Sequence, residues 1–412
     1  MFQSLDRVVY QVTDIQQAQN WYNNLLKTEP VFASPLIVIY HIGSSSLALV
    51  PIGNASSQSN ERIVAFWSVT EIDTAFQCML DAGATKHTDI TPVLNTKIAK
   101  VIDPFGNIIG ITGKDSAKPK SLENKPSETA MTVAFCRALA TVDEREELRG
   151  PDYLAEIFLT EDGKRPLKDQ AARKWVMDNL MTGGVYEYFI ARTAYLDQVV
   201  ADALRENIPQ IVFLGAGYDT RSYRLRELIR DTKIFEVDII STQQRKKQLL
   251  ETARISIPEQ LTFISINFEK DDFSDLFAKA GFKRNHKTLF IWEGVTYYLT
   301  PEAVDSTLDF VKNNSPAGST ICFDYSADAP DMDERYGVKQ TKESMKATYT
   351  AERVQFKIAE GTIDSFLTER GYQMTVHLTP EEMERMYLTL GNGTLAGKVV
   401  ANLCLVQAVV TN

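Results

Sequence analysis

The sequence contains few cysteines, and they lie far apart. Only four occur among 412 residues, with no C-x-x-C pair, at positions Cys78, Cys136, Cys322 and Cys404. A disulfide-dense secreted scaffold is therefore excluded, and reduced thiols in a cytoplasmic protein are expected. The chain is also too long for one ordinary hydrophobic core, which predicts two domains.

An excess of positive charge is missing as well. Lys and Arg number 44 against 54 Asp and Glu, giving a formal net charge of -10. The chain thus lacks the electrostatic footprint of a protein that binds nucleic acid or an anionic membrane. No apolar run approaches the length of a membrane span, and the first seven residues lack the basic-then-apolar order of a signal peptide. We expect neither nucleic acid nor membrane as a partner.

The most informative stretch is Ile211–Leu225, which reads I-V-F-L-G-A-G-Y-D-T-R-S-Y-R-L. Its first four residues are apolar and predict a buried strand of a parallel sheet. Gly215 and Gly217 permit a tight turn and close approach to a ligand, because neither carries a Cβ. Asp219 and Thr220 are placed to cap a helix that follows. An adenosyl or nucleotide ligand would bind at this turn.

A carboxylate follows the glycines at the spacing expected for recognition of a ribose. The next predicted strand, 232–238, ends in Phe-Glu-Val-Asp, and Asp238 lies roughly 20 residues beyond Gly217, where an acid binds a ribose diol. The third glycine of G-x-G-x-x-G is missing, with Thr220 in its place. Because a pyrophosphate requires that glycine, S-adenosyl-L-methionine (SAM), which has no phosphate, fits better than NAD or FAD.

These motifs, together with the later Trp292-Glu-Gly-Val-Thr-Tyr-Tyr-Leu299, resemble the leucine carboxyl methyltransferase-like family of class I SAM-dependent methyltransferases. The resemblance covers roughly residues 126–412. It implies an α/β, Rossmann-like fold with a mostly parallel seven-stranded sheet, SAM as cofactor, and a catalytic domain over 127–412. The helix predicted over 127–140 would serve as a lid.

The resemblance also assigns residues to SAM. Arg192, in a helix predicted over 185–207, would bind the SAM carboxylate through two hydrogen bonds; an ordinary surface ion pair with Glu187 or Asp197 is the alternative. Glu293, at the end of the predicted fourth strand, would lie next to the methyl donor, or else cap the following turn. The cofactor-binding candidates are Arg192, Gly215, Ala216, Gly217, Asp238, Asn267, Phe268 and Glu293.

Two of these candidates depart from the family pattern. The family usually has Asp-Leu where this chain has Asn267-Phe268. Asn267 can still accept a hydrogen bond from the adenine amino group, without a charge, and Phe268 could cover the adenine face. Tyr297 and Tyr298 follow Glu293, so one of them could face the methyl acceptor; both could equally belong to the core.

The first 113 residues contain a pattern that occurs twice. A strand, a helix and further strands are predicted at 7–12, 15–26, 36–41 and 46–50, and again at 63–69, 72–82, 97–102 and 107–112. This order predicts an α+β domain of paired βαβββ modules. A polar stretch with two prolines, 114–126, predicts a linker after it.

The segments 12–22 and 103–110 resemble the glyoxalase and bleomycin-resistance superfamily, also called vicinal oxygen chelate. Its enzymes bind a divalent metal through His and Glu side chains. The matching positions here are Arg7, Ala48, Val64 and Gly110, none of which offers an imidazole or a carboxylate. We therefore expect a metal-free domain. Two interpretations follow: a structural or dimer-forming module, or a cup for a small aromatic or carboxylate molecule with Arg7 and Trp67 on its walls.

Methyl transfer from a sulfonium mainly requires alignment of donor and acceptor. A carboxylate acceptor needs no base, and neither His286 nor His377 is well placed to act as one. The leading hypothesis is therefore an O-methyltransferase that modifies a carboxylate or acidic hydroxyl of a small molecule, for example a specialised metabolite. The alternatives are a protein C-terminal leucine carboxyl methyltransferase and a non-catalytic protein that binds SAM or a small molecule. No catalytic residue is assigned.

Overall fold

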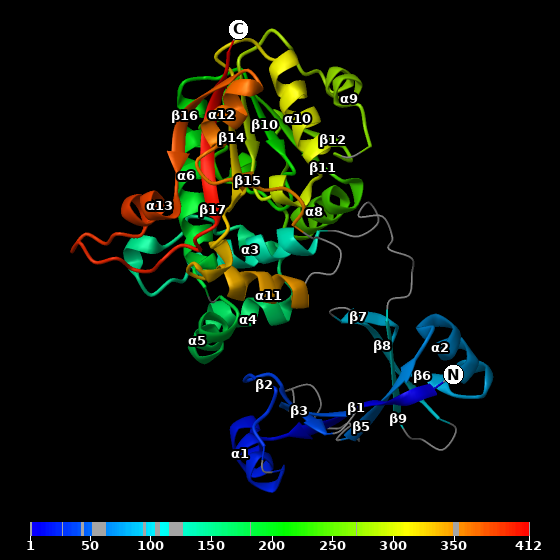
Figure 1. Cartoon of the computed structure of the whole chain (residues 1–412). Helices are drawn as coiled ribbons and strands as arrows, with labels where there is room; N and C mark the ends of the chain where they lie inside the picture. The colour runs from blue at the N-terminus through cyan, green and yellow to red at the C-terminus, as the bar shows by residue number, and fades with distance from the viewer. Residues whose placement is uncertain are drawn as a thin grey trace. The chain divides into compact units, whose positions relative to one another are not determined.

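The computed structural model describes residues 2–26, 28–42, 45–51, 63–93, 96–103, 108–114, 127–181, 183–268, 270–348 and 354–411 (Figure 1). The chain divides into two compact units, Met1–Pro119 with Ala171–Trp175, and Lys120–Gln170 with Val176–Asn412. Apart from Lys114, the linker predicted over 114–126 lies outside the described residues, as do 104–107 of the second glyoxalase-like motif.

The first unit has the predicted doubled order of elements. Its first module is β1 (Phe2–Val12), α1 (Ile15–Leu26), β2 (Phe32–Ala33), β3 (Val38–Ile42) and β4 (Ser45–Pro51). The second is β5 (Ile63–Val69), α2 (Ile72–Asp81), β6 (Thr85–Lys86), β7 (Thr91–Val93), β8 (Thr96–Ile102) and β9 (Ile108–Lys114). The strands form one sheet in the order β2-β3-β4-β1-β5-β9-β8-β6, with β7 beside β8. The predicted pair of βαβββ modules is confirmed.

The strand register relates the two modules by an approximate twofold axis. Val9 pairs with both Ala48 and Val64, and Phe66 pairs with both Arg7 and Gly110. Paired residues lie on the same face, so the four positions matched to metal ligands share one face of the sheet. The ring of Phe66 lies over Gly110, where a Cβ would come within 2.6 Å of it.

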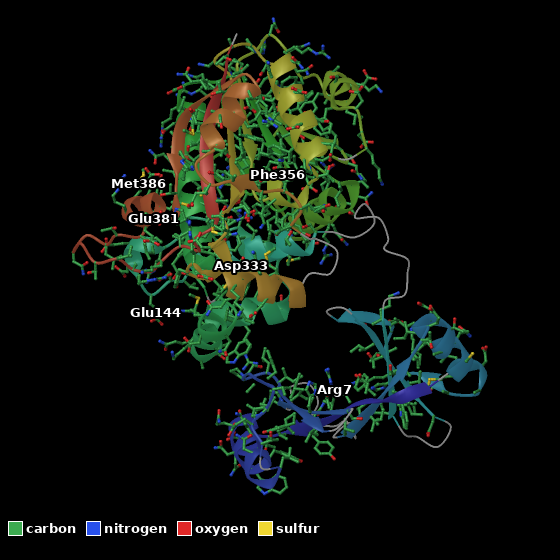
Figure 2. The ribbon with its side chains drawn as sticks, viewed as in Figure 1. Arg7, Glu144, Asp333, Phe356, Glu381 and Met386 are labelled. Carbon is green, nitrogen blue, oxygen red and sulfur yellow. The ribbon has the colours of Figure 1, made fainter. Side chains whose placement is uncertain are left out.

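Trp67 lies on the opposite face, which corrects the expectation that Arg7 and Trp67 line one cup. Trp67 follows Phe66 in β5 and pairs with Ile111. Ile111 is buried with Ile72 and Met79 of α2. Successive strand residues alternate between faces, so Trp67 points toward the helices. Of the two residues, only Arg7 (labelled in Figure 2) remains on the face away from α1 and α2.

The second unit begins with helices and continues as an alternating α/β sheet. Its helical part is α3 (Glu128–Ala140), η2 (Glu146–Leu148), η3 (Ala155–Phe158), α4 (Glu161–Lys168), α5 (Gln170–Asn179) and α6 (Val185–Arg205). The sheet part is β10 (Gln210–Leu214), α7 (Arg221–Arg224), β11 (Lys233–Asp238), α8 (Ile240–Thr252), β12 (Leu261–Ser265), α9 (Phe273–Lys279), β13 (Thr288–Trp292), η4 (Thr296–Tyr298), α10 (Pro301–Asn313), β14 (Thr320–Asp328), η5 (Met332–Glu334), α11 (Val338–Thr348), β15 (Ile358–Ala359), α12 (Ile363–Glu369), β16 (Tyr372–Leu378), α13 (Pro380–Tyr387) and β17 (Leu403–Val410).

The strand order of this sheet is β12-β11-β10-β13-β14-β17-β16, with the two-residue β15 beside β14. All its strands run parallel except β17, which is antiparallel to both neighbours. Every residue of β10 and β13 is buried, as expected for central strands covered by helices on both faces. The predicted Rossmann-like sheet is confirmed, and its carboxyl edge lies where β10 gives way to the glycine turn.

One of the predicted helix caps was wrong. The helix after the glycine turn is only one turn long. Of its two predicted caps, Asp219 accepts a hydrogen bond from Arg221 N, whereas the hydroxyl of Thr220 accepts one from Arg224 Nε instead. The helix predicted over 127–140 is present as α3, and Ser127 caps it by accepting a hydrogen bond from Ala130 N.

Three chain segments cross at glycines near the start of α6. Gly183, Gly184 and Gly337 have φ values of 71°, 81° and 73°. A Cβ on Gly337 would lie 1.8 Å from the Gly183 oxygen, and one on Gly184 would lie 2.3 Å from the Lys398 oxygen. No side chain fits at this crossing. It joins the beginning of α6 to the segments that precede α11 and β17.

Candidate functional site

The glycine turn after β10 has the geometry that its sequence predicts. Gly215 and Gly217 have φ values of 72° and 49°, which favour glycine. Gly217 N donates a hydrogen bond of 2.6 Å to Asp238 Oδ2 at the end of β11, and Ala216 N donates one to Val237 O. A Cβ on Gly217 would lie 3.1 Å from the Ala130 Cβ of α3. The structure therefore brings Gly215, Ala216, Gly217 and Asp238 together beneath α3.

Arg192 is buried and paired with two carboxylates. Its side chain is 1% exposed, with Nη1 2.6 Å from Asp324 Oδ2 and Nε 3.0 Å from Glu293 Oε1. Neither of the predicted alternative partners contacts it in this way: Glu187 lies 4.0 Å from Arg145, and Asp197 pairs with Arg221. Arg192 and Glu293, assigned separately by the resemblance, thus lie in direct contact.

Asp324, at the end part of β14, was not predicted as a site residue. Its side chain is fully buried and accepts hydrogen bonds from Tyr188 Oη at 2.6 Å and from Gly294 N at 2.7 Å, besides the one from Arg192. The hydroxyl of Tyr297 lies 3.4 Å away. Asp324 therefore holds Arg192 and the turn that carries Glu293 in one arrangement, with Tyr297 turned inward.

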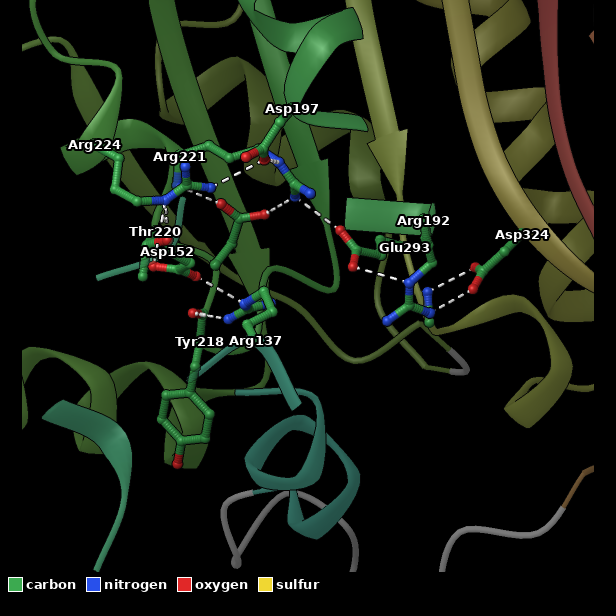
Figure 3. A network of polar contacts seen from close by, with 12 residues as sticks. Arg137, Asp152, Arg192, Asp197, Tyr218, Thr220, Arg221, Arg224, Glu293 and Asp324 are labelled. Carbon is green, nitrogen blue, oxygen red and sulfur yellow. Dashed lines mark hydrogen bonds and ion pairs between the residues drawn. The ribbon is translucent and has the colours of Figure 1, made fainter. Parts of the chain in front are cut away.

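A second set of charged residues extends this contact into a buried network (Figure 3). Arg221 binds Asp197 and Glu293, each at 2.7 Å, and also binds Asp219. Arg224 lies 2.9 Å from Asp197 and 3.3 Å from Asp152. Arg137 of α3 lies 2.8 Å from Asp152 and donates to the Tyr218 carbonyl at 2.6 Å. The network therefore joins α3, α6, the glycine turn and the ends of β13 and β14.

Sequence reasoning gave no role to Arg137, Asp152, Arg221, Arg224 or Asp324. Arg221 and Arg224 stand inside the quoted glycine motif, and two arginines directly after a buried strand were the one available signal. Asp324 offered a weaker one, as an acid inside an otherwise apolar strand. Their partners are separated from them by up to 136 residues, so the pairings themselves could not be read from the sequence.

The charges in the network shift the pKa values of its members. Burial alone would raise the pKa of Glu293, but the charges of Arg221 and Arg192 outweigh it and lower the pKa to about 2. The pKa of Asp197 is likewise lowered, because Arg221 and Arg224 overcome the effect of burial. Burial would lower the pKa of Arg192, but the neighbouring Glu293 charge raises it well above its ordinary value. All three side chains are therefore ionised at neutral pH.

Asn267 and Phe268 follow β12, the neighbour of β11. Ile266 N donates to the Asp238 carbonyl at 3.0 Å, so this segment lies beside the predicted ribose acid. Asn267 N donates to Asp271 Oδ2. The Phe268 ring stacks on Trp292 at 6.4 Å and meets Phe273 edge-on at 5.4 Å. Phe268 is thus half-buried and packed against the rings of Trp292 and Phe273.

Two buried polar atoms of residues in the glycine turn have no hydrogen-bond partner among the residues that the structure describes. They are Tyr218 Oη and Arg221 Nη2, on side chains that are each 2% exposed. Burial raises the pKa of Tyr218 to about 12, so its hydroxyl remains a donor. Buried donors without partners are costly, and a ligand with hydroxyl and carboxylate groups fits them. This chemistry agrees with SAM, whose ribose and amino-acid end carry both.

Over the described ranges, no cluster of three or more His, Cys, Asp or Glu side chains could hold a metal ion. None of the helices in the described part of the chain is both long and apolar enough to cross a membrane.

Comparison with known proteins gives matches to both halves of the chain. Residues 130–312 match the family described as leucine carboxyl methyltransferase, and residues 4–111 match the glyoxalase/bleomycin resistance protein/dioxygenase superfamily. YktD of Bacillus subtilis, named as a candidate SAM-dependent methyltransferase, is 33% identical over 202 residues, which are 48% of this chain and 66% of YktD. A Frankia alni protein with the same kind of name is 31% identical over 206 residues, 47% of this chain and 66% of its own.

The matched stretch is thus just under two thirds of the length of these relatives. Among solved structures, a DUF574 family protein from Streptomyces avermitilis aligns with 66% of this chain and 96% of its own, at 11% identity and a TM-score of 0.43.

Proposed function

We infer that the chain, which belongs to the leucine carboxyl methyltransferase family over residues 130–312 and to the glyoxalase superfamily over 4–111, is a SAM-dependent methyltransferase. The observation that carries this proposal is the contact between Arg192 and Glu293 beside the glycine turn. The amino-acid end of SAM is a zwitterion, and these two side chains carry the complementary charges. We assign the activity to a domain over 127–412 and treat 1–113 as a metal-free module.

Each candidate residue has a distinct role in this proposal. Arg192 binds the SAM carboxylate and Glu293 its ammonium group, while Asp324 keeps Arg192 in position. Asp238 accepts hydrogen bonds from the ribose, and the turn formed by Gly215, Ala216 and Gly217 lets the backbone approach it. Asn267 and Phe268 contact the adenine.

The reaction requires positioning more than acid–base chemistry. SAM supplies an electrophilic methyl group on a sulfonium. The protein aligns the acceptor with it and excludes water, a task suited to a network whose members Arg192 and Glu293 are 1% and 10% exposed. His286 precedes β13, at the edge opposite the glycine turn, and His377 Nε2 lies 2.9 Å from the Tyr325 hydroxyl. Neither is placed as a base for this site.

An acceptor that is already anionic agrees best with this arrangement. We propose O-methylation of a carboxylate or an acidic hydroxyl on a small molecule, with Tyr297 or Tyr298 near the acceptor. A protein with a C-terminal leucine carboxylate is the second candidate, favoured by the family alone. A protein that binds SAM without turnover is the third.

Calorimetry with SAM, followed by transfer of a tritiated methyl group, distinguishes the three. The acceptors are a panel of small carboxylic acids and phenols and a peptide that ends in leucine. We expect SAM binding and transfer to a small acid. Transfer to the peptide alone selects the second candidate, and binding without transfer to any acceptor selects the third. If SAM does not bind, the site assignment is wrong.

A further inference from the structure

The buried network of Figure 3 contains more acids than bases. It joins five carboxylates to four guanidinium groups, which are those of Asp152, Asp197, Asp219, Glu293 and Asp324 and those of Arg137, Arg192, Arg221 and Arg224. None of these side chains is more than 13% exposed. Among the residues that the structure describes, the network therefore has one negative charge in excess.

The charged side chains around the network do not offset this excess. Three further sets lie near α3 or the glycine turn, which are Lys246 with Glu236, Arg145 with Asp143 and Glu187, and Arg245 and Asp238, both near Tyr218. The first and third sets contain one acid for each base, and the second contains two acids for one base. No positive charge is left over in these sets to balance the network.

The excess charge persists at neutral pH. Burial would raise the pKa values of Glu293 and Asp197, but the neighbouring arginines lower both, that of Glu293 to about 2. Both side chains therefore remain carboxylates. Because an unbalanced charge in a buried site is costly, the site favours a ligand that brings one positive charge over a ligand that brings none.

SAM and its demethylated product, S-adenosylhomocysteine (SAH), differ by one such charge. Both carry the same adenosine and the same zwitterionic amino-acid end, but only SAM has a positive sulfonium. When the acceptor oxygen bonds to the methyl carbon, the methyl–sulfur bond breaks and its electron pair stays on sulfur. SAH is therefore a neutral thioether. Bound SAM balances the charge of the network, whereas bound SAH leaves the excess in place.

We propose that this excess charge makes the site selective for SAM over SAH, and that Asp197 is a specificity-determining residue. Asp197 pairs with Arg221 and Arg224 at 2.7 and 2.9 Å, and Arg221 links it to Glu293. Asp197 thus contributes its charge without touching the ligand. The inference rests on the proposed function, because it assumes that SAM binds beside Glu293. Its consequence is that SAH leaves readily and inhibits the protein only weakly.

Calorimetry on the whole protein, without a methyl acceptor, tests the selectivity. The ligands are SAM, SAH and sinefungin, which carries a protonated amine where SAM has its methylated sulfur. We expect SAM and sinefungin each to bind at least about tenfold more tightly than SAH. SAH that binds as tightly as SAM overturns the inference and leaves the proposed function standing. If none of the three ligands binds, the proposed function is wrong and the inference falls with it.

Asp197→Asn tests the assigned residue, since it keeps the shape of the side chain and removes the excess charge. The affinities for SAM and SAH should then differ by about twofold or less. A purely geometric role of Asp197, acting through Arg221 and Glu293, would change both affinities alike, because the two ligands share their amino-acid end. Asp197→Glu keeps the charge and should keep the parental ratio of the two affinities.

Asp202→Asn is the matched control. It removes the same charge from the same helix, but Asp202 is 50% exposed beside Arg205, where water and salt screen its field. The ratio of the SAM and SAH affinities should not change in this variant. A reduction as large as in Asp197→Asn would show that the net charge of the protein, and not the buried network, sets the ratio.

Asp152→Asn provides a second test at the other end of the network, should Asp197→Asn not fold. It removes one carboxylate from between Arg137 and Arg224 and should also lower the ratio of the two affinities. Thermal unfolding identifies which variants are folded. An unchanged ratio in the folded Asn variants of the network, or sinefungin that binds as weakly as SAH, would overturn the inference.

Discussion

The two units place very different side chains at the centre of their sheets. In the first unit, the face away from the helices carries Arg7, Ala48, Val64 and Gly110 at the positions matched to metal ligands, with a phenylalanine ring over the glycine. In the second, the strand ends carry a network of buried arginines and carboxylates. Both folds are intact. A sheet can therefore keep its fold without reactive side chains. For this reason, a catalytic site must be assigned from its individual residues and not from the fold.

The largest expected difference between the units is in stability. Arg192→Ala leaves Asp324 and one side of Glu293 buried without a cation, which should cost about 3–5 kcal/mol in the free energy of unfolding. Arg7→Ala removes a side chain whose Nε has no hydrogen-bond partner in the described part of the chain, and should cost about 1 kcal/mol or less. Urea denaturation of both variants measures this. Equal losses would show that the network is not what stabilises the second unit.

Acid should destabilise the second unit through protonation of Glu293. Its folded pKa of about 2 lies below the ordinary value of 4.5, so its stabilising contribution is complete above pH 4.5 and is lost as the pH falls toward 2. The loss should be on the order of 3 kcal/mol. Unfolding measured across this range should have a shallower pH dependence in Glu293→Gln than in the parent protein. Identical slopes would contradict the assigned shift.

Affinity for SAM should depend on one unit only. Asp238→Asn keeps the size of the side chain but removes the charge that faces the ribose, and should weaken SAM binding about tenfold. Arg7→Gln, in the first unit, serves as the control and should leave the Kd unchanged. Calorimetry measures the Kd of SAM for both variants. If Asp238→Asn binds SAM with the affinity of the parent protein, the ribose does not bind at Asp238.

The smallest effect is expected from metal ions. Incubation with Zn²⁺, Ni²⁺ or Fe²⁺ followed by dialysis should leave no stoichiometric metal, and the melting temperature should not change, because the matched positions offer no imidazole or carboxylate. Metal analysis of the dialysed protein is the measurement. One bound ion per chain would mean that the strands of the first unit were matched to the superfamily incorrectly.

Periodic and local signals predicted most of the architecture. The helix over 15–26 and the strand over 63–69 have their predicted bounds, because both depend on short apolar patterns. The capping box at Thr379 and Glu382, which starts α13, was available in the sequence and was not used. At the start of the helix after the glycine turn, Asp219 was correctly predicted as a cap, but the hydroxyl of Thr220 binds Arg224 instead.

The sequence predicted several residues of the site, but not which of them contact one another. The motif spacing selected Asp238, at the end of β11, and the resemblance selected Arg192 of α6 and Glu293 directly after β13, which lie in contact. It gave no indication that Asp324 binds Arg192, since that contact spans 132 residues and depends on packing of α6 against the sheet. The face on which Trp67 lies was also missed, because strand alternation fixes a face only once the register is known.

The glycine crossing near α6 has a consequence for biosynthesis. The helix that carries Arg192 is fastened at its start by Gly337 and by the segment around Lys398, both made long after α6 leaves the peptidyl transferase centre. A nascent chain in which these residues have not yet been synthesised lacks the contacts that hold the start of α6 in position. Arg192 should therefore form its ion pairs with Asp324 and Glu293 only late in translation. Until then, chaperones would bind a chain in which this site is not yet folded.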